Sequence, residues 1–408
     1  MEEFASPVFG DDNWVEGEKE EFKREIDENG VSNIEEFLRK RLEKWREVEV
    51  NIAVTGDSGV GKSSFINAIR ELCDDDEGAA PVDVTECTAE PTIYDHPSNS
   101  NIKFWDLPGI GTPNYPDLET YVQKVQLDKY HAFLILTAAR FTENDLLLAK
   151  TVKSMEKRFF CIRTKIDENV RAESRKKSFN EEAMLTKIRR NCLKNLSDLL
   201  RHEKDVFLIS NHEPAKWDFV RLTQAILDAL SRYQRETMTL SLGKAITKSS
   251  TEIFQRKVDA LKCRIWKVAA ASAFAALFPM AGLSFGVDAG LILSELRFYR
   301  SQLGLPETDS VEFARLPPAT KEKVFKAWQI STAGQLSAVL ASYSTESGVE
   351  EAVRFIIPFF GSVVASGMSY GAACYALHTL LKTVEDAVLS VIREAAEKTA
   401  AELESQID

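Results

Sequence analysis

The sequence predicts an α/β domain with a mostly parallel sheet, preceded and followed in the chain by all-α segments. Two observations support this fold class. In the middle of the chain, short apolar segments alternate with helical segments, as in parallel α/β sheets. Outside that region the pattern is helical. We expect N-terminal helices over 1–46, the α/β domain over 47–232 and a C-terminal helical part over 233–408.

The predicted strands are short apolar segments, and each is followed by a helical pattern. We expect strands at 49–55, 101–106, 131–137, 158–163 and 205–209, with an edge strand near 92–95. We expect helices at 62–72, 117–128, 142–157, 179–201 and 217–232. The third of these helices starts with Thr142-Glu-Asn-Asp145, a capping arrangement with acids in the first turn.

Two helices are predicted before the sheet. The first, over 18–28, is charged and ends at Asn29-Gly30, and Ser32-Asn-Ile-Glu35 is a capping box that starts the second. The second helix carries an apolar stripe, which must be buried. We expect the C-terminal half to cover this stripe, which consists of Ile34, Phe37, Leu38, Leu42 and Trp45.

Composition limits the compartment and the partners. With 408 residues, 44% of them hydrophobic, the chain is longer than one α/β domain needs and has ample material for a core. The net charge is −12 and no arginine-rich or aromatic-basic patch occurs, which argues against nucleic acid as a partner. The six cysteines show no C-x-x-C spacing and no signal peptide is evident, so we expect a cytoplasmic rather than a secreted protein.

The first predicted strand of the α/β domain runs directly into a G-x-x-x-x-G-K-S sequence at 56–63, and a helix follows. This context predicts a phosphate-binding loop, in which backbone N–H groups and a helix N-terminus hold phosphate. Lys62 is placed to reach the outer phosphates, and the Ser63 hydroxyl to ligate Mg²⁺. The residues expected to contact nucleotide are Gly56, Asp57, Ser58, Gly59, Val60, Gly61, Lys62, Ser63 and Ser64.

The strand over 101–106 ends in a D-x-x-G sequence. Asp106 is expected to hold Mg²⁺ and the Gly109 N–H to sense a γ-phosphate. Between the phosphate-binding loop and this sequence, residues 78–92 lack periodicity, as a mobile switch loop should. One threonine of this stretch is expected to complete the Mg²⁺ site, and the sequence leaves three candidates open: Thr85, Thr88 and Thr92.

Two later segments predict that the base is guanine. The strand over 158–163 ends in Thr164-Lys165-Ile166-Asp167-Glu168, close to the N-K-x-D of guanine-nucleotide proteins. The Asp167 carboxylate only accepts hydrogen bonds, and guanine offers it N1–H and the N2 amine, whereas adenine does not. Lys165 should lie over the base. The strand over 205–209 ends in Ser210-Asn211, which fits the last guanine-contacting loop.

The residue after D-x-x-G affects the expected rate. Ras-like enzymes have a Gln there that orients the attacking water, whereas this chain has Ile110. We therefore expect slow intrinsic hydrolysis and help from a partner or a second copy.

Two stretches of the C-terminal half, 268–287 and 355–381, contain no Asp, Glu, Lys or Arg and are long enough to cross a bilayer. They also contain Pro, Gly and other small residues, which suit tightly packed helices. The sequence leaves two alternatives open: buried bundle helices, or helices that dock on or insert into a membrane as a hairpin.

Taken together, the chain resembles the immunity-related (interferon-inducible) GTPases. The resemblance rests on the phosphate-binding loop through Asn67, on Phe104-Trp-Asp-Leu-Pro-Gly-Ile-Gly111, on Ala139-Arg-Phe-Thr-Glu-Asn-Asp145, on Arg163-Thr-Lys-Ile-Asp167 and on Ile209-Ser-Asn211. It implies a Ras-like P-loop domain inserted into a helical domain. It also implies Mg²⁺-dependent hydrolysis of GTP to GDP, stimulated in trans within a dynamin-like homo-oligomer whose G domains face each other.

The resemblance has further implications and limits. An acidic switch residue is implicated in activation in the family, and the matching position here is Asp83, one carbon shorter than Glu. Lys62 matches the effector-type members, whereas regulators have Met there. The start Met1-Glu2 differs from the Met-Gly of myristoylated relatives, so we expect any membrane attachment to use the uncharged stretches.

Two functions remain in competition. The first is a GTP-hydrolysing enzyme that assembles on intracellular membranes in cell-autonomous innate defence. The second is a GTP-regulated binding module that acts on a protein effector, with incidental turnover.

Overall fold

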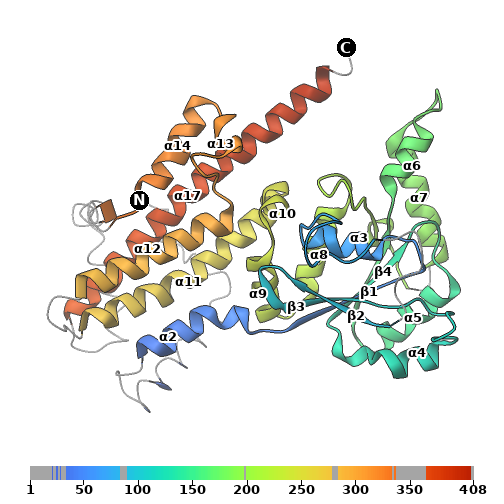
Figure 1. Ribbon diagram of the computed structural model, residues 1–408, viewed down its shortest axis with the longest axis horizontal. Helices are drawn as coiled ribbons and strands as arrows, with labels where there is room; N and C mark the ends of the chain where they lie inside the picture. The colour runs from blue at the N-terminus through green and yellow to red at the C-terminus, as the bar shows by residue number, and fades with distance from the viewer. Residues whose placement is uncertain are drawn as a thin grey trace. The chain divides into compact units, whose positions relative to one another are not determined.

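The computed structural model describes residues 34–82, 90–196, 199–277, 284–332, 335–336 and 364–405, together with positions 21, 24, 25 and 28 (Figure 1). The chain forms two units. One is Trp45–Ser250, and the other combines Met1–Lys44 with Thr251–Asp408. The first contains the sheet and the second is helical, so the predicted fold class, an α/β domain inserted into an all-α domain, is confirmed.

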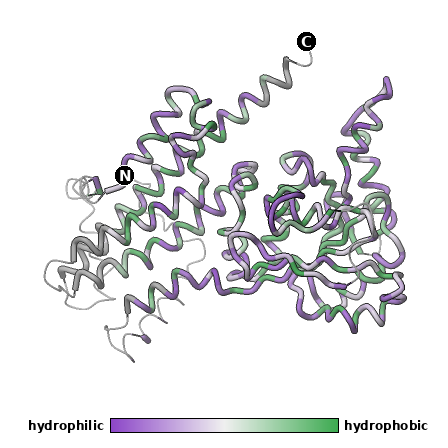
Figure 2. Tube along the Cα trace, in the orientation of Figure 1, coloured by the Kyte–Doolittle hydropathy of each residue, from purple (hydrophilic) through white to green (hydrophobic). Residues whose placement is uncertain are grey.

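The sheet has six strands in the order β2-β3-β1-β4-β5-β6. All pairs are parallel except β2 with β3, so β2 is an antiparallel edge strand. The strands lie close to their predicted positions: β1 (Val50–Thr55), β2 (Thr92–His96), β3 (Asn99–Asp106), β4 (Ala132–Thr137), β5 (Arg158–Arg163) and β6 (Val206–Leu208). Every side chain of β1 and β4 is buried, which explains why most of their residues are apolar (Figure 2).

Helices cover both faces of the sheet (Figure 1). On one face, α4 (Leu118–Val125) and α5 (Glu143–Ser154) pack on Ala53 and Phe133. On the other lie α3 (Lys62–Ile69) and α8 (Phe219–Ala229), whose Phe65 and Phe219 rings are 5.7 Å apart. Thr142 and Asp145 form the predicted capping box at the start of α5.

Two helical predictions differ from the structure. The helix expected over 179–201 is shorter, α7 (Glu181–Asn195), and α6 (Ile166–Glu173) was not predicted. Helix α6 starts directly after Lys165, which takes a positive φ of 58° and turns the chain out of β5.

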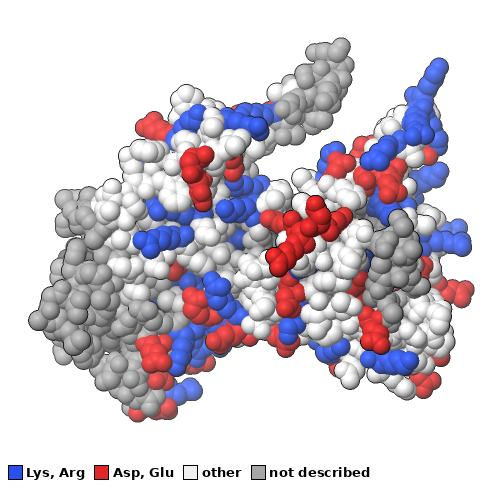
Figure 3. Space-filling view, viewed as in Figure 1, with Lys and Arg blue, Asp and Glu red and all other residues white. Residues whose placement is uncertain are grey.

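Figure 3 shows basic side chains gathered where α6 passes to α7, at the exposed Arg175, Lys176 and Lys177.

The α/β unit extends beyond residue 232, the end expected from the sequence. It includes α9 (Arg232–Ser241) and α10 (Lys244–Ser249) and ends at Ser250. Hydrogen bonds hold these helices to this unit, because the Thr237 hydroxyl donates to the Trp45 carbonyl (2.7 Å) and the α10 N-terminus binds Glu71. The alternation of strands and helices does not predict that α9 and α10 belong to this unit, because both helices come after the last strand in the sequence.

The helical unit contains α2 (Ile34–Glu43), α11 (Thr251–Leu277), α12 (Ser284–Leu303), α13 (Val311–Ala314), α14 (Pro318–Gln329) and α17 (Val364–Ser405). Helix α11 contacts α2, α12 and α17. Leu38 of the predicted stripe is fully buried, whereas Phe37 and Leu42 are half-buried. Trp45 departs from the prediction, because it follows α2 in a 3₁₀ turn and belongs to the α/β unit. Most of the helix predicted over 18–28 lies outside the described residues.

The uncharged stretches are described only in part. Residues 268–271 of the first are buried within the helical unit, as are Ala373, Ala376, Leu377, Leu380 and Leu381 of the second. The side chains of 272–287 and 355–370 lie outside the described residues. Within the part of the chain that is described, no helix combines the length and apolar character that a membrane crossing requires.

A buried ion pair joins three segments of the helical unit. Arg264 on α11 donates to both carboxylate oxygens of Glu295 on α12 (2.9 and 3.2 Å) and to the Leu42 carbonyl of α2 (2.7 Å). The two side chains are only 4% and 7% exposed. Removing one partner would leave the other charge buried without compensation.

We therefore predict that Glu295→Ala lowers the free energy of unfolding of the helical unit by about 3–5 kcal/mol. Native-state hydrogen exchange of the α12 amides measures this unit separately from the sheet. The control is the double variant Arg264→Met/Glu295→Leu, which removes both charges and should recover most of the loss. A single variant with unchanged exchange would contradict the role of the pair.

Candidate nucleotide-binding site

The phosphate-binding loop connects β1 to α3, as predicted from the sequence. Gly56, Gly59 and Gly61 have φ values of 140°, 74° and 91°, conformations that a side chain makes costly. Gly61 is the N-cap of α3, so the loop brings backbone N–H groups and the helix N-terminus together. Asp57 and Ser58 lie exposed on the loop, Val60 is buried beneath it, and Ser64 is half-buried in the first turn of α3.

The start of the loop is packed against two neighbouring strand ends. A Cβ atom on Gly56 would lie 2.1 Å from the Leu136 carbonyl oxygen of β4, so no larger residue fits. A Cβ on Gly109 would lie 3.6 Å from the Gly56 carbonyl oxygen. The backbone of the D-x-x-G segment therefore lies directly beside the phosphate-binding loop, as a γ-phosphate sensor must.

Lys62 lies across the loop that precedes it. Its Nζ donates to the carbonyls of Gly56 (3.0 Å) and Asp57 (3.2 Å), and the residue is 9% exposed. These bonds hold a positive charge over the glycine-rich backbone, where the outer phosphates of a nucleotide would lie.

The two predicted Mg²⁺ ligands are adjacent. The Ser63 hydroxyl donates to Oδ2 of Asp106 at 3.3 Å, with Ser63 in the first turn of α3 and Asp106 at the end of β3. A hydroxyl and a carboxylate at this spacing are hard oxygen donors of the kind that Mg²⁺ prefers, so these residues fit the ion. Of the threonine candidates, Thr92 begins β2, where it is paired in register with Asp106. Thr85, Thr88 and Asp83 lie outside the described residues.

Thr164 connects the base-recognition segment to the phosphate-binding loop. It is fully buried, and its hydroxyl lies 2.7 Å from the Val60 carbonyl oxygen. The Thr164 N–H also donates to the Thr137 carbonyl (2.9 Å). A threonine thus holds the two loops together at the position where the N-K-x-D pattern has an Asn.

The residues expected at the base lie around the N-terminus of α6. Asp167 is in the first turn of the helix and is 8% exposed, which suits a carboxylate that binds the paired donors of guanine. Lys165 precedes the helix, and its Nζ lies 3.9 Å from Glu168 on the same turn. The Arg163 guanidinium donates to the Thr164 carbonyl (2.8 Å) and to Asn169 (2.9 Å), which fixes the turn.

The last predicted segment approaches the same place. The Ile166 N–H donates to the Ile209 carbonyl (3.2 Å), so the loop after β6 lies beside the start of α6. Ser210 is fully buried and accepts from the N–H groups of His212 and Glu213 (both 3.2 Å). The Asn211 amide donates to the Gly61 carbonyl at 3.0 Å. Asn211 therefore binds the phosphate-binding loop at the carbonyl next to the one that Thr164 binds.

Ile110 is held by the aromatic core. Its side chain packs against the cluster that includes Tyr115 and Tyr121, and its carbonyl accepts from the Asn144 amide (3.0 Å). Asn144 was not singled out as a site residue, although it lies within the Arg-Phe-x-x-x-Asp segment. Only the fold shows that the first turn of α5 reaches the residue after Gly109.

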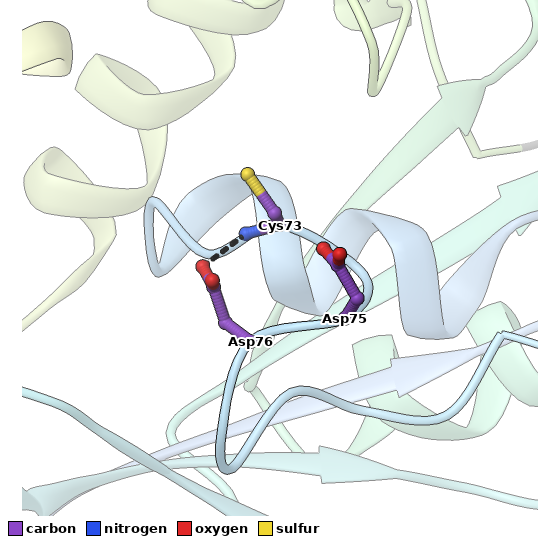
Figure 4. A group of neighbouring side chains, drawn as sticks. All are labelled: Cys73, Asp75 and Asp76. Carbon is purple, nitrogen blue, oxygen red and sulfur yellow. Dashed lines mark hydrogen bonds between the residues drawn. The ribbon is translucent and has the colours of Figure 1, made fainter.

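A second group of potential metal ligands lies on the loop after α3. Cys73, Asp75 and Asp76 are neighbours on the exposed surface (Figure 4), and the Cys73 N–H donates to the Asp76 carboxylate at 2.7 Å. This bond is that of a local turn, and exposed carboxylates often cluster in this way. We assign no metal to this group.

The bond between Thr164 and Val60 gives a test of the site. Thr164→Val keeps the shape but leaves the buried Val60 carbonyl without this donor, at a cost of about 1–3 kcal/mol. We predict that the Kd for GDP rises about 5- to 150-fold, as measured by isothermal titration calorimetry. Thr164→Ser keeps the hydroxyl and should stay close to wild type. Equal losses in both variants would show that the hydroxyl is not the cause.

The family model of the interferon-inducible GTPases (IIGP) matches residues 16–402. Interferon-gamma-inducible GTPase 10 of Mus musculus is 32% identical over 373 residues, which cover 89% of this chain and 85% of that protein. Interferon-inducible GTPase 1 of Mus musculus is 37% identical over 270 residues, covering 65% of this chain and 64% of the relative, just under two thirds.

Two solved structures are matched with low scores. The cytosolic domain of the T. maritima FeoB iron transporter matches 72% of this chain and 98% of its own (TM-score 0.29, 16% identity). An oligomerised bacterial dynamin matches 96% of this chain and 77% of its own (TM-score 0.32, 13% identity). These scores are too low to support an argument. The family match over nearly the whole length is decisive, and the chain belongs to the interferon-inducible GTPases, a family of GTP-hydrolysing enzymes.

Proposed function

We propose that this GTPase hydrolyses GTP slowly as a single molecule and faster in a GTP-dependent homo-oligomer whose G domains face each other. The environment of Ile110, the residue directly after the D-x-x-G sequence, supports this proposal. Its side chain packs on the aromatic core, and the amide of the neighbouring Asn144 is already bound to its carbonyl. The residue that orients the attacking water in Ras-like enzymes therefore has no equivalent at this position, and a second molecule is the natural source of the missing contribution.

In this proposal, the nucleotide is held from three directions. The phosphate-binding loop and Lys62 bind the phosphates, and Ser63 and Asp106 hold Mg²⁺, which neutralises charge on the β- and γ-phosphates when it is bound. Asp167 selects guanine because adenine would leave its carboxylate unpaired. The burial of Asp167 supports this assignment, since an unpaired carboxylate costs more where water is excluded.

We further propose that the assembly forms on intracellular membranes and acts in cell-autonomous defence. Family membership supports the defence role, since the relatives are described as interferon-inducible. The uncharged sequences at 268–287 and 355–381 support the membrane role. We place the protein on the cytoplasmic side of these membranes. Asp83 remains the candidate for the acidic switch residue that acts on the partner's nucleotide.

The concentration dependence of turnover tests the proposal. We predict that GTP hydrolysis per molecule rises at least about tenfold between nanomolar and tens of micromolar protein, because a second molecule completes the site. Phosphate release should be measured with and without liposomes, and Lys62→Ala should abolish turnover at every concentration. A specific activity that stays constant over the range would contradict activation in trans. Assembly without turnover would favour the regulated binding module instead.

A further inference from the structure

Glu71 occupies an unusual position at the far end of α3. It is not a glycine, yet its φ is 55°, in the left-handed region that few residues other than Gly, Asn and Asp adopt readily. Its carboxylate accepts hydrogen bonds from the N–H groups of Ile246 (2.7 Å) and Ala245 (3.3 Å), in the first turn of α10. A residue just beyond the C-terminus of α3 therefore caps a helix that lies far from it in the sequence.

Gly243 leaves room for the Glu71 carboxylate at the start of α10. It is the N-cap of α10, and its backbone (φ −73°, ψ 179°) is one that any residue can adopt. A Cβ atom at this position, however, would lie 2.1 Å from the Glu71 carboxylate. A side chain at this position is therefore compatible with the backbone conformation but would displace the Glu71 carboxylate.

The same end of α3 holds both flanks of residues 83–89. Asn67 donates to the Ala80 carbonyl (2.9 Å) and accepts from its N–H (2.7 Å). Arg70 donates to the carbonyls of Gly78 (2.8 Å) and Asp95 (3.0 Å). Asn67 and Arg70 are 1% and 6% exposed, so these are interior contacts with fixed geometry.

Helix α3 thus has a phosphate-binding end and an anchoring end. Its first residues are Lys62 and Ser63, at the phosphates and the Mg²⁺ site. Near its C-terminus, Asn67 and the C-cap Arg70 contact the switch flanks, and Glu71, just after the helix, contacts α10. Helix α10 ends at Ser249, and α11 of the helical unit begins at Thr251. A displacement of α3 on a change of nucleotide would move the cap of the helix that leads into the helical unit.

From this arrangement we propose that α3 transmits the nucleotide state to the helical unit, and that the capping of α10 by Glu71 is the output contact. The mechanism has two states. In one position of α3 the N-terminus of α10 is capped by Glu71, in the other it is not, and GDP and GTP favour different positions. The inference goes beyond the proposed function, because it requires nucleotide at the phosphate-binding loop but neither assembly nor a membrane.

Hydrogen exchange of the full chain, with GDP or a non-hydrolysable GTP analogue, tests the proposal. In the wild type, both nucleotides should protect residues 56–64, and exchange over 244–255 should differ about fivefold or more between them. Glu71→Ala should keep the loop protection, which shows that the variant folds and binds, and should lose the difference over 244–255. Gly243→Ala displaces the same carboxylate and should have the same effect, with no addition in the double variant.

Glu77→Ala is the matched control, since it removes an exposed carboxylate from the same loop and should keep the wild-type difference. The proposal is overturned if Glu71→Ala and Gly243→Ala both keep that difference. It is equally overturned if the wild type shows no difference over 244–255 while the loop is protected. No protection of the loop by either nucleotide would overturn the nucleotide assignment, and this proposal with it.

Discussion

The close approach of Gly56 to the end of β4 is the constraint on which the rest of the site depends. Parallel pairing of β1 with both β3 and β4 brings three strand ends to one edge of the sheet. There, Gly56 lies against the Leu136 carbonyl, and Gly109 lies against Gly56. Because only a glycine fits at this point, the chain can turn into the phosphate-binding loop and still keep the D-x-x-G backbone beside it. The Ser63–Asp106 contact follows from the same register.

The loop is then held by side chains from elsewhere in the sheet. Thr164 binds the Val60 carbonyl and Asn211 binds the Gly61 carbonyl, so the two base-recognition segments also support the phosphate-binding loop. In the proposed nucleotide site, this arrangement would couple recognition of the base to the shape of the phosphate site. At its other end, α3 is equally constrained through Arg70 and Glu71. A helix held at both ends is suited to transmit a displacement rather than absorb it.

The sequence predicts the sheet and the placement of the nucleotide loops well, because buried strands and glycine-rich turns are local signals. It does not predict contacts that join distant segments. Asn144 reaches Ile110, and Glu71 reaches α10, only because of how helices pack on the sheet. For the same reason, the sequence assigned Trp45 and residues 233–250 to the helical part, although their hydrogen bonds join them to the sheet unit. The α6 helix was missed because its start depends on the positive φ of Lys165.

We propose that this site is built for guanine. The most direct measurement is the equilibrium affinity for GDP, ADP and XDP of the wild type and of Asp167→Asn. We predict that the wild type prefers GDP over ADP by at least about a hundredfold, since mismatched adenine leaves a buried carboxylate unpaired. In the variant, the amide can donate to the additional carbonyl of xanthine, so the preference should change from GDP to XDP. Equal binding of ADP and GDP by the wild type, or an unchanged GDP affinity in Asp167→Asn, would contradict it.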